Sequence, residues 1–217
     1  MKMSKTHAEI DEEHNLKKAG KIIAVLKTIK PLGKCNVLDI GTGSGVIARE
    51  LSKNSKTVTS IDIADDRIVK QGYTFTRVKN AKIPFEEEKF DIVVSNHVIE
   101  HIPKKEQATH CEEIFRVLKK NGVCYMATPN KYWIIGKEQR DPEVNNISYA
   151  EIVRLTKKFQ IRNLTIDVII NPKKFKLDMW KSIQFLGKII PRAILEKMNI
   201  IFPTYIVLLT KNKESIK

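Results

Sequence analysis

The segment that decides the fold is residues 37–45, Val-Leu-Asp-Ile-Gly-Thr-Gly-Ser-Gly. It is a short apolar run that leads into three alternate glycines, and a helical pattern resumes over residues 46–53. Glycine lacks a Cβ, so these positions permit a tight turn and a close approach of the backbone to a ligand. The N-terminus of the following helix adds unpaired amide groups. The segment predicts a buried strand, a ligand-binding turn and a helix.

The spacing of the glycines argues against two common nucleotide-binding patterns. The dinucleotide fingerprint G-x-G-x-x-G would place its third glycine at position 46, which is Val46. A Walker A loop would continue into Gly-Lys-Ser/Thr, and this turn does not. The pattern therefore argues against NAD and against ATP as a phosphoryl donor.

A carboxylate closes the second predicted strand, which spans residues 57–63. Asp62 follows the glycine turn by roughly 20 residues, where a carboxylate accepts hydrogen bonds from the ribose hydroxyls of a nucleoside cofactor. An aspartate at such a position can instead cap a helix. The glycine turn before it favours the ribose interpretation.

Periodicity outside the turn predicts alternating strands and helices. Apolar residues at helical spacing cover residues 8–29, 104–119 and 149–159, with at most a short helix over 65–70. Further strands are predicted over residues 73–78, 90–95, 122–128, 161–170 and 205–210. Helices over 177–190 and 193–198 would separate the last two strands, which then form an antiparallel pair. The alternation predicts an α/β fold with a doubly wound, mostly parallel sheet covered by helices on both faces.

Length and charge suggest how the chain is organised. Its 217 residues suit one domain, with an N-terminal helical cap over residues 1–33 and a helical insert over 171–203. The net charge is +14, and residues 151–217 carry +9 of it. Such a basic surface attracts phosphate, nucleic acid or anionic lipid, although a solvated lysine-rich surface gives the same pattern.

Cysteine usage and the apolar segments bear on the cellular compartment. The three cysteines include no Cys-x-x-Cys pair, so we expect neither a disulfide framework nor a metal site. The first residues do not resemble a secretory signal, and no apolar stretch approaches the roughly 20 residues that span a bilayer. We therefore expect a cytoplasmic protein.

Five segments in order resemble the class I S-adenosylmethionine (SAM)-dependent methyltransferases, in the ubiquinone/menaquinone biosynthesis-like, type 11 group. They are D-I-G-T-G-S-G from Asp39, the pair Asp62-Ile63, K-N-A-K-I-P-F at 79–85, F-D-I-V-V-S-N-H-V-I-E-H-I at 90–102, and E-I-F-R-V-L-K-K-N-G-V-C-Y-M-A-T-P at 113–129. The resemblance covers roughly residues 35–130. It implies a Rossmann-like sheet of seven strands with a reversed last strand, and SAM as the cofactor.

The resemblance also implies roles for individual positions. The first motif would line the methionine part of SAM, Asp62 would hold the ribose, and Ile63 would pack on the adenine. The full cofactor-binding set is Asp39, Gly41, Thr42, Gly43, Gly45, Asp62, Ile63, Asn80, Ala81, Ser95 and Asn96. Asn80 stands where the family usually has aspartate, but its amide oxygen can still accept a hydrogen bond from the adenine amine.

Two histidines are candidates for a general base. His97 and His101 follow the strand over 90–95, near the expected methyl group, and histidine titrates near neutrality. Each has a structural alternative: His97 can pack against the cofactor, and His101 can fix the start of a helix near Pro103. The same interpretation has Glu100 solvated or capping a helix.

Candidate acceptor-binding residues lie outside the motifs. Tyr132 and Trp133 can stack on a substrate or cap the edge of the sheet. The insert over 171–203 mixes apolar and lysine residues, which suits a lipid-like acceptor or an acidic membrane surface. A helix that faces the core gives the same pattern.

The sequence as a whole predicts a SAM-dependent methyltransferase. Because SAM carries its own electrophile, the protein need only align an acceptor and exclude water, with a base for weak nucleophiles. Methyltransferases that act on planar amines carry Asn-Pro-Pro-aromatic at the end of the strand predicted here over residues 90–95. This sequence has S-N-H-V at 95–98 instead, which favours an oxygen or carbon acceptor. We expect the acceptor to be a small, lipid-linked or glycan-linked metabolite. Two alternatives stay open: an RNA or protein methyltransferase, and a SAM-binding module without catalysis.

Overall fold

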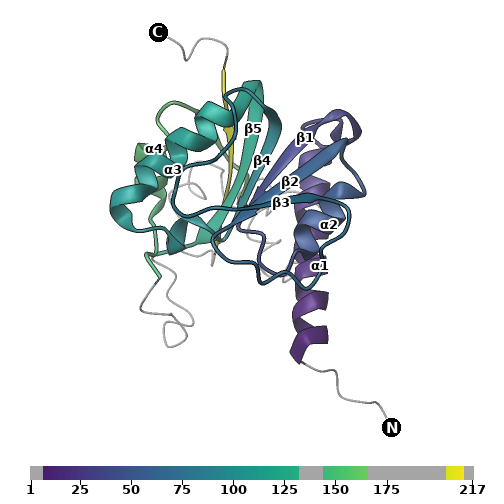
Figure 1. The fold of residues 1–217 in the computed structure, drawn as a ribbon. Coiled ribbons are helices and arrows are strands. Elements are labelled where there is room, and N and C mark those ends of the chain that lie inside the picture. The colour runs from purple at the N-terminus through teal and green to yellow at the C-terminus, as the bar shows by residue number, and fades with distance from the viewer. Residues whose placement is uncertain (1–6, 132–143, 166–203, 213–217) are drawn as a thin grey trace, which may run out of the picture.

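A computed structural model describes residues 7–131, 144–165 and 204–212 of the chain (Figure 1). The helices expected over 177–190 and 193–198, the insert over 171–203, and the candidate substrate residues Tyr132 and Trp133 lie outside the described residues.

A seven-stranded sheet forms the middle layer, in the order β3-β2-β1-β4-β5-β7-β6. Strands β1 to β5 pair in parallel, and β7 runs antiparallel to both β5 and β6. The strands are β1 (Asn36–Ile40), β2 (Thr57–Asp62), β3 (Thr74–Arg77), β4 (Phe90–Asn96), β5 (Leu118–Pro129), β6 (Gln160–Asn163) and β7 (Thr204–Thr210). The predicted mostly parallel sheet with a reversed last strand is confirmed. Its strand order reverses between β1 and β4, where sheets of this kind bind ligands beyond the carboxyl ends of the strands.

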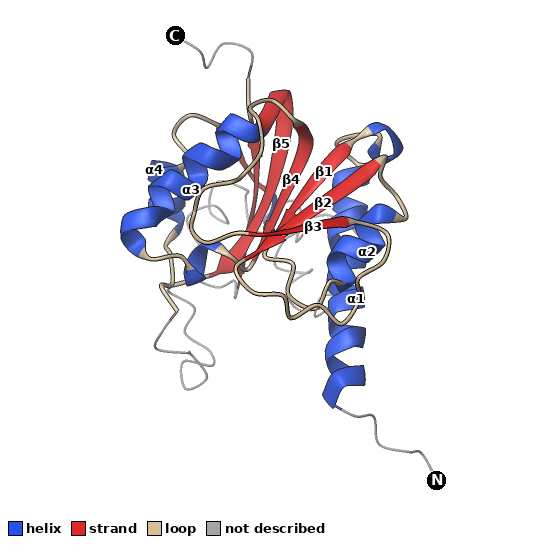
Figure 2. Ribbon diagram, in the orientation of Figure 1, coloured by secondary structure: helices blue, strands red, loops and turns tan. Residues whose placement is uncertain are grey.

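Helices cover both faces of this sheet (Figure 2). They are α1 (His7–Lys27), α2 (Val46–Ser52), α3 (Lys104–Val117) and α4 (Tyr149–Leu155), with short 3₁₀ turns η1 (Leu32–Lys34) and η2 (Ile99–His101). Along β1, Val37 packs in the core under α1 and α2, whereas Leu38 packs in the core under α3 and α4. Because both faces are buried, the central strands read as continuous apolar runs. Among the described helices, none is long and apolar enough to cross a membrane.

Two expected elements differ from the structure. No helix forms over residues 65–70, because the N–H groups of Ile68 and Val69 both donate to the Ser44 carbonyl at 3.0 Å. The segment is thereby tied to the glycine turn, and it is too short to make helical bonds as well. The strand expected over 161–170 ends at Asn163, where the side-chain oxygen accepts from the N–H of Thr165 and turns the chain.

Helix α3 buries a histidine. His110 is 2% exposed, and its Nε2 has no hydrogen-bond partner among the described residues. Burial lowers its pKa to about 4, against a smaller opposing effect of Glu113. The imidazole is therefore neutral in the folded protein at pH 7.

This histidine should make the stability of the protein depend on pH. Between pH 6.5 and about 4 the unfolded chain binds a proton that the folded chain does not, so stability falls as the pH falls through this range. The loss reaches about 3 kcal/mol at pH 4. Denaturant unfolding of His110→Leu should show a flatter profile than wild type, while the exposed His14→Gln should match wild type. Parallel profiles for His110→Leu and wild type would contradict the prediction.

Candidate functional site

A cavity of about 650 Å³ lies at the carboxyl ends of β1, β2 and β4. Its walls are formed by four segments of the chain that are far apart in sequence. The predicted site residues that line it are Gly41, Gly43, Asp62, Ile63, Asn80, Ala81, His97 and His101. The structure therefore brings most of the predicted set to the point where the strand order reverses.

The other predicted positions lie outside the cavity wall: Asp39, Thr42, Gly45, Ser95 and Asn96. Asp39 and Ser95 are buried beside the strand ends, and neither Asp39 Oδ2 nor Ser95 Oγ has a hydrogen-bond partner within the described parts of the chain. Burial, and then the nearby charge of Asp62, raises the pKa of Asp39 well above its ordinary value. Buried polar atoms without partners are uncommon, and they mark a place where a ligand or water belongs.

The three glycines of the turn have positive φ angles but different surroundings. A Cβ at Gly43 would meet no described atom within 4 Å, so this position faces open space. A Cβ at Gly41 would lie 2.5 Å from Val98 Cγ2. A Cβ at Gly45 would strike the Val69 carbonyl and the Tyr73 hydroxyl. Gly43 thus serves the cavity, whereas Gly45 allows α2 to pack against the segment before β3.

Asp62 holds the turn together and faces the cavity. Its Oδ2 accepts from the N–H of Gly43 at 2.9 Å, and its Oδ1 accepts from the N–H of Ile63 at 2.7 Å and weakly from Ala64 at 3.4 Å. A carboxylate has about four lone-pair sites, so acceptor capacity remains for hydroxyl groups of a ligand. Ile63 beside it is 66% exposed, which offers an apolar surface to a ring.

Asn80 also lines the cavity, with its side chain turned onto its own chain. Its Oδ1 accepts a hydrogen bond from the N–H of Lys82 at 3.0 Å. The amide group is exposed, so a ligand can still reach it beside the backbone of Ala81.

His97 reaches the cavity through an unusual backbone conformation. Its φ of 58° is in the left-handed region, and its N–H donates to the carbonyl of Ala127 at 2.8 Å. Its Nδ1 lies 3.1 Å from Oε1 of Glu100, whose Oε2 accepts from the Thr128 hydroxyl at 3.0 Å. Glu100 is 1% exposed, so the expectation that it is solvated or caps a helix was wrong. These two partners offset the cost of burying Glu100, because a buried carboxyl group needs hydrogen bonds.

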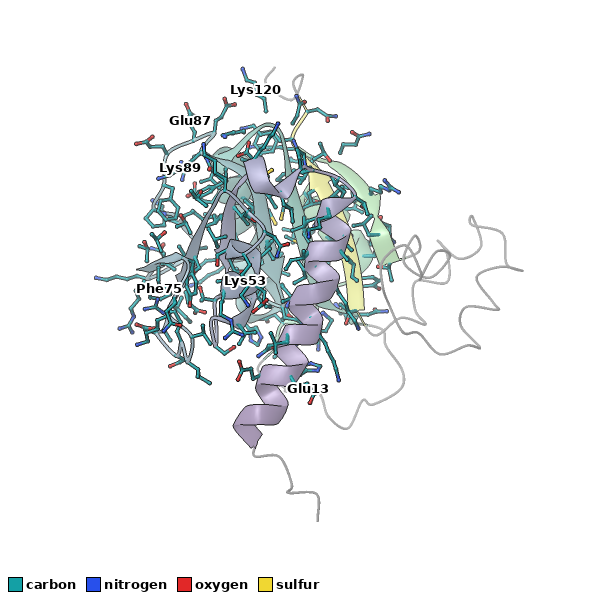
Figure 3. All side chains as sticks on the ribbon, turned by 90° about the vertical axis from the view of Figure 1, so that its right-hand side faces the viewer. Glu13, Lys53, Phe75, Glu87, Lys89 and Lys120 are labelled. Carbon is teal, nitrogen blue, oxygen red and sulfur yellow. The ribbon has the colours of Figure 1, made fainter. Side chains whose placement is uncertain are left out.

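The N-terminal helix lies over the same region. Asn15 Nδ2 donates to the hydroxyl of Ser44 in the glycine turn at 3.3 Å. Lys18 is half-buried, and burial lowers its pKa while attraction to Glu100 opposes that shift. Figure 3 shows α1 lying across one face of the molecule, with its first turns extending beyond the sheet.

Glu100, Thr128 and Lys18 interact behind His97 outside the cavity wall, and the sequence did not predict this group. Thr128 is 28 residues from Glu100 and Lys18 is on another element, so only the assembled fold pairs them. The available signal was the position of Thr128 in the sequence, since it lies near the carboxyl end of β5, next to the end of β4.

Comparison with known proteins identifies the matching stretch. The methyltransferase domain family matches residues 38–126, which hold the glycine turn, Asp62, His97 and Glu100. The chain is 32% identical over 115 residues to the mitochondrial ubiquinone biosynthesis O-methyltransferase of Bos taurus, covering 47% of this chain and 30% of that protein. It is 30% identical over 118 residues to the arsenite methyltransferase of Mus musculus, covering 44% and 31%. The alignments thus span less than a third of the length of these curated relatives.

The fold is shared with solved structures. A SAM-dependent methyltransferase from Archaeoglobus fulgidus superposes with a TM-score of 0.62, covering 95% of this chain and 100% of that chain at 17% identity. Residues 38–126 thus resemble a methyltransferase domain, and the chain shares its fold with solved SAM-dependent methyltransferases.

Proposed function

We propose that this chain is a cytoplasmic enzyme that transfers the methyl group of SAM to an oxygen or carbon of a small, lipid-linked or glycan-linked metabolite. The observation that carries the proposal is the shared cavity, which has Gly43 and Asp62 in one wall and His97 in another. A binding turn and a candidate base therefore open onto one space. The three buried free cysteines suit a reducing compartment.

The residues of the cavity fit SAM. Gly43 leaves room beside the turn, Asp62 has acceptor capacity for ribose hydroxyls, and the exposed Ile63 suits an adenine ring. Asn80 and Ala81 offer polar groups to the edge of that ring. Asp39 and Ser95, whose buried oxygens have no described partner, lie next to this cavity at the strand ends.

In methyl transfer from SAM the protein mainly has to position the cofactor and the acceptor. When bound, SAM supplies a methyl group on a positively charged sulfur, which is the electrophile. The chain's own residues then bind the cofactor, orient an acceptor and exclude water. His97 and His101 line the cavity and are the candidate bases.

The relatives support the acceptor class. One is named for O-methylation in ubiquinone biosynthesis, which favours an oxygen of a small or lipid-linked molecule. Residues 171–203, with their lysines and apolar side chains, would make any contact with an acidic surface that carries such an acceptor.

Calorimetry with S-adenosylhomocysteine, the product form of the cofactor, tests the proposal first. We expect one binding site per chain, and the absence of binding would overturn the proposal. Incubation with methyl-labelled SAM and a cell extract should then place label in the lipid or small-molecule fraction. Label in RNA, together with salt-dependent RNA binding, would favour the RNA alternative. Binding without transfer to any fraction would favour a non-catalytic SAM-binding module.

A further inference from the structure

We propose that Glu100 and Thr128 hold His97 as a general base for a hydroxyl acceptor. This inference rests on the proposed function, because the base is of use only if SAM occupies the same cavity. Glu100 and Thr128 are positioning residues here, and His97 is the residue that contacts the acceptor.

The backbone places His97 for this role. β4 ends at Asn96, and the left-handed conformation of the next residue turns the chain out of the strand direction. Non-glycine residues seldom adopt this conformation, and they persist in it where the surrounding structure enforces it. The hydrogen bond from its N–H to Ala127 fixes the turn to the neighbouring strand. The imidazole is 33% exposed and lines the cavity, so one side of the ring is open to a ligand.

Glu100 determines which ring nitrogen is free. A carboxylate only accepts hydrogen bonds, so Oε1 at 3.1 Å from Nδ1 requires the proton of a neutral imidazole to be on Nδ1. Nε2 then has the free lone pair that a base needs. Thr128 donates to the other oxygen, which keeps Glu100 from rotating. Because Glu100 is buried, these hydrogen bonds compete little with water.

A cation of the N-terminal helix interacts with Glu100. Lys18 of α1 has an electrostatic attraction to this carboxylate. The other charged or titratable groups of the cavity wall are Asp62, Lys79, Lys82, His101, Glu106 and His110. Within the described residues, Glu100 is the carboxylate within hydrogen-bond distance of His97.

In the proposed step His97 takes the proton of the acceptor hydroxyl. The acceptor O–H bond breaks and its proton goes to Nε2 of His97. The oxygen forms the new bond to the methyl carbon as the methyl–sulfur bond breaks, and that electron pair stays on sulfur. The product is a methyl ether and an imidazolium that Glu100 stabilises. A hydroxyl needs this assistance because it is a weak nucleophile when neutral, whereas a thiol that ionises near neutral pH does not.

Nuclear magnetic resonance of ¹⁵N-labelled histidine in the full chain with S-adenosylhomocysteine tests the geometry without knowledge of the acceptor. We expect neutral His97 to carry its proton on Nδ1 in wild type. Glu100→Leu should shift the proton toward Nε2, while Glu112→Gln, on the exposed side of α3, should leave it on Nδ1. A His97 protonated on Nε2 in wild type would overturn the inference.

Two acceptor probes test the chemistry. Catechol supplies a hydroxyl, and thiophenol supplies a sulfur that ionises without help. Where these probes are methylated, Glu100→Gln should lower the turnover of catechol by about 100-fold, the lower range for loss of general-base catalysis. Turnover of thiophenol and the affinity for S-adenosylhomocysteine should change less than threefold. An equal loss for both probes would mean that Glu100 is merely structural. Failure of S-adenosylhomocysteine to bind wild type would instead refute the proposed function itself.

Discussion

Replacing Asp62 with alanine should weaken binding of S-adenosylhomocysteine by about 100-fold or more. The carboxylate would hold the ribose hydroxyls through charge-assisted hydrogen bonds, each of which contributes about 1.5–3 kcal/mol. The same substitution removes the acceptor for the N–H of Gly43, which is 2.9 Å away, and loosens the turn beside the ligand. The loss of the ribose hydrogen bonds and the loosening of the turn both weaken ligand binding. Calorimetric titration of wild type and variant measures the change.

A matched control separates the site from the surrounding charge. Asp66 is an exposed carboxylate four residues further along, and Asp66→Ala removes the same charge without touching the turn. It should bind S-adenosylhomocysteine like wild type. Asp62→Asn keeps an acceptor oxygen but loses the charge, so its affinity should lie between the two. Wild-type affinity in Asp62→Ala would refute the ribose assignment.

The elements around the cavity could be predicted because their signals are local. The apolar run of β1, the alternate glycines and the start of α2 lie within one short segment, and the same holds for β4 and its following turn. A strand buried on both faces is apolar along its whole length, and a turn with positive φ angles favours glycine. Both features can be recognised from the residue types.

The predictions failed where a long-range contact decides the structure. Glu100 reads as a solvated acid, and nothing near it in sequence shows that Thr128 will donate to it across the sheet. A short helix was expected at most over residues 65–70, but the N–H groups of Ile68 and Val69 bond to Ser44, more than 20 residues earlier. His110 had a local signal, since it lies one helical turn before Ile114 on the buried face of α3.

Gly43 and Gly45 should respond differently to substitution by alanine. Gly45→Ala should lower the free energy of unfolding by about 2–5 kcal/mol, from the left-handed backbone and from overpacking. Its φ is 84°, and the new Cβ would strike the Val69 carbonyl, which is backbone and cannot rotate away. Tyr73 donates to that same carbonyl, so relief of the collision would also break this hydrogen bond. Denaturant unfolding measures the loss.

Gly43→Ala is the matched comparison, because the two residues are in the same turn and both have positive φ. Its Cβ would meet no described atom within 4 Å, so only the backbone cost of about 1–2 kcal/mol applies to stability. The methyl group would instead occupy space beside the cavity that we assign to SAM, and affinity for S-adenosylhomocysteine should fall at least tenfold. If Gly43→Ala bound normally, or if Gly45→Ala were as stable as wild type, the division between a binding glycine and a packing glycine would be wrong. The spacing of the glycines in the motif does not distinguish the two positions. Their surroundings do, because a Cβ at Gly45 would collide with the backbone and a Cβ at Gly43 would not.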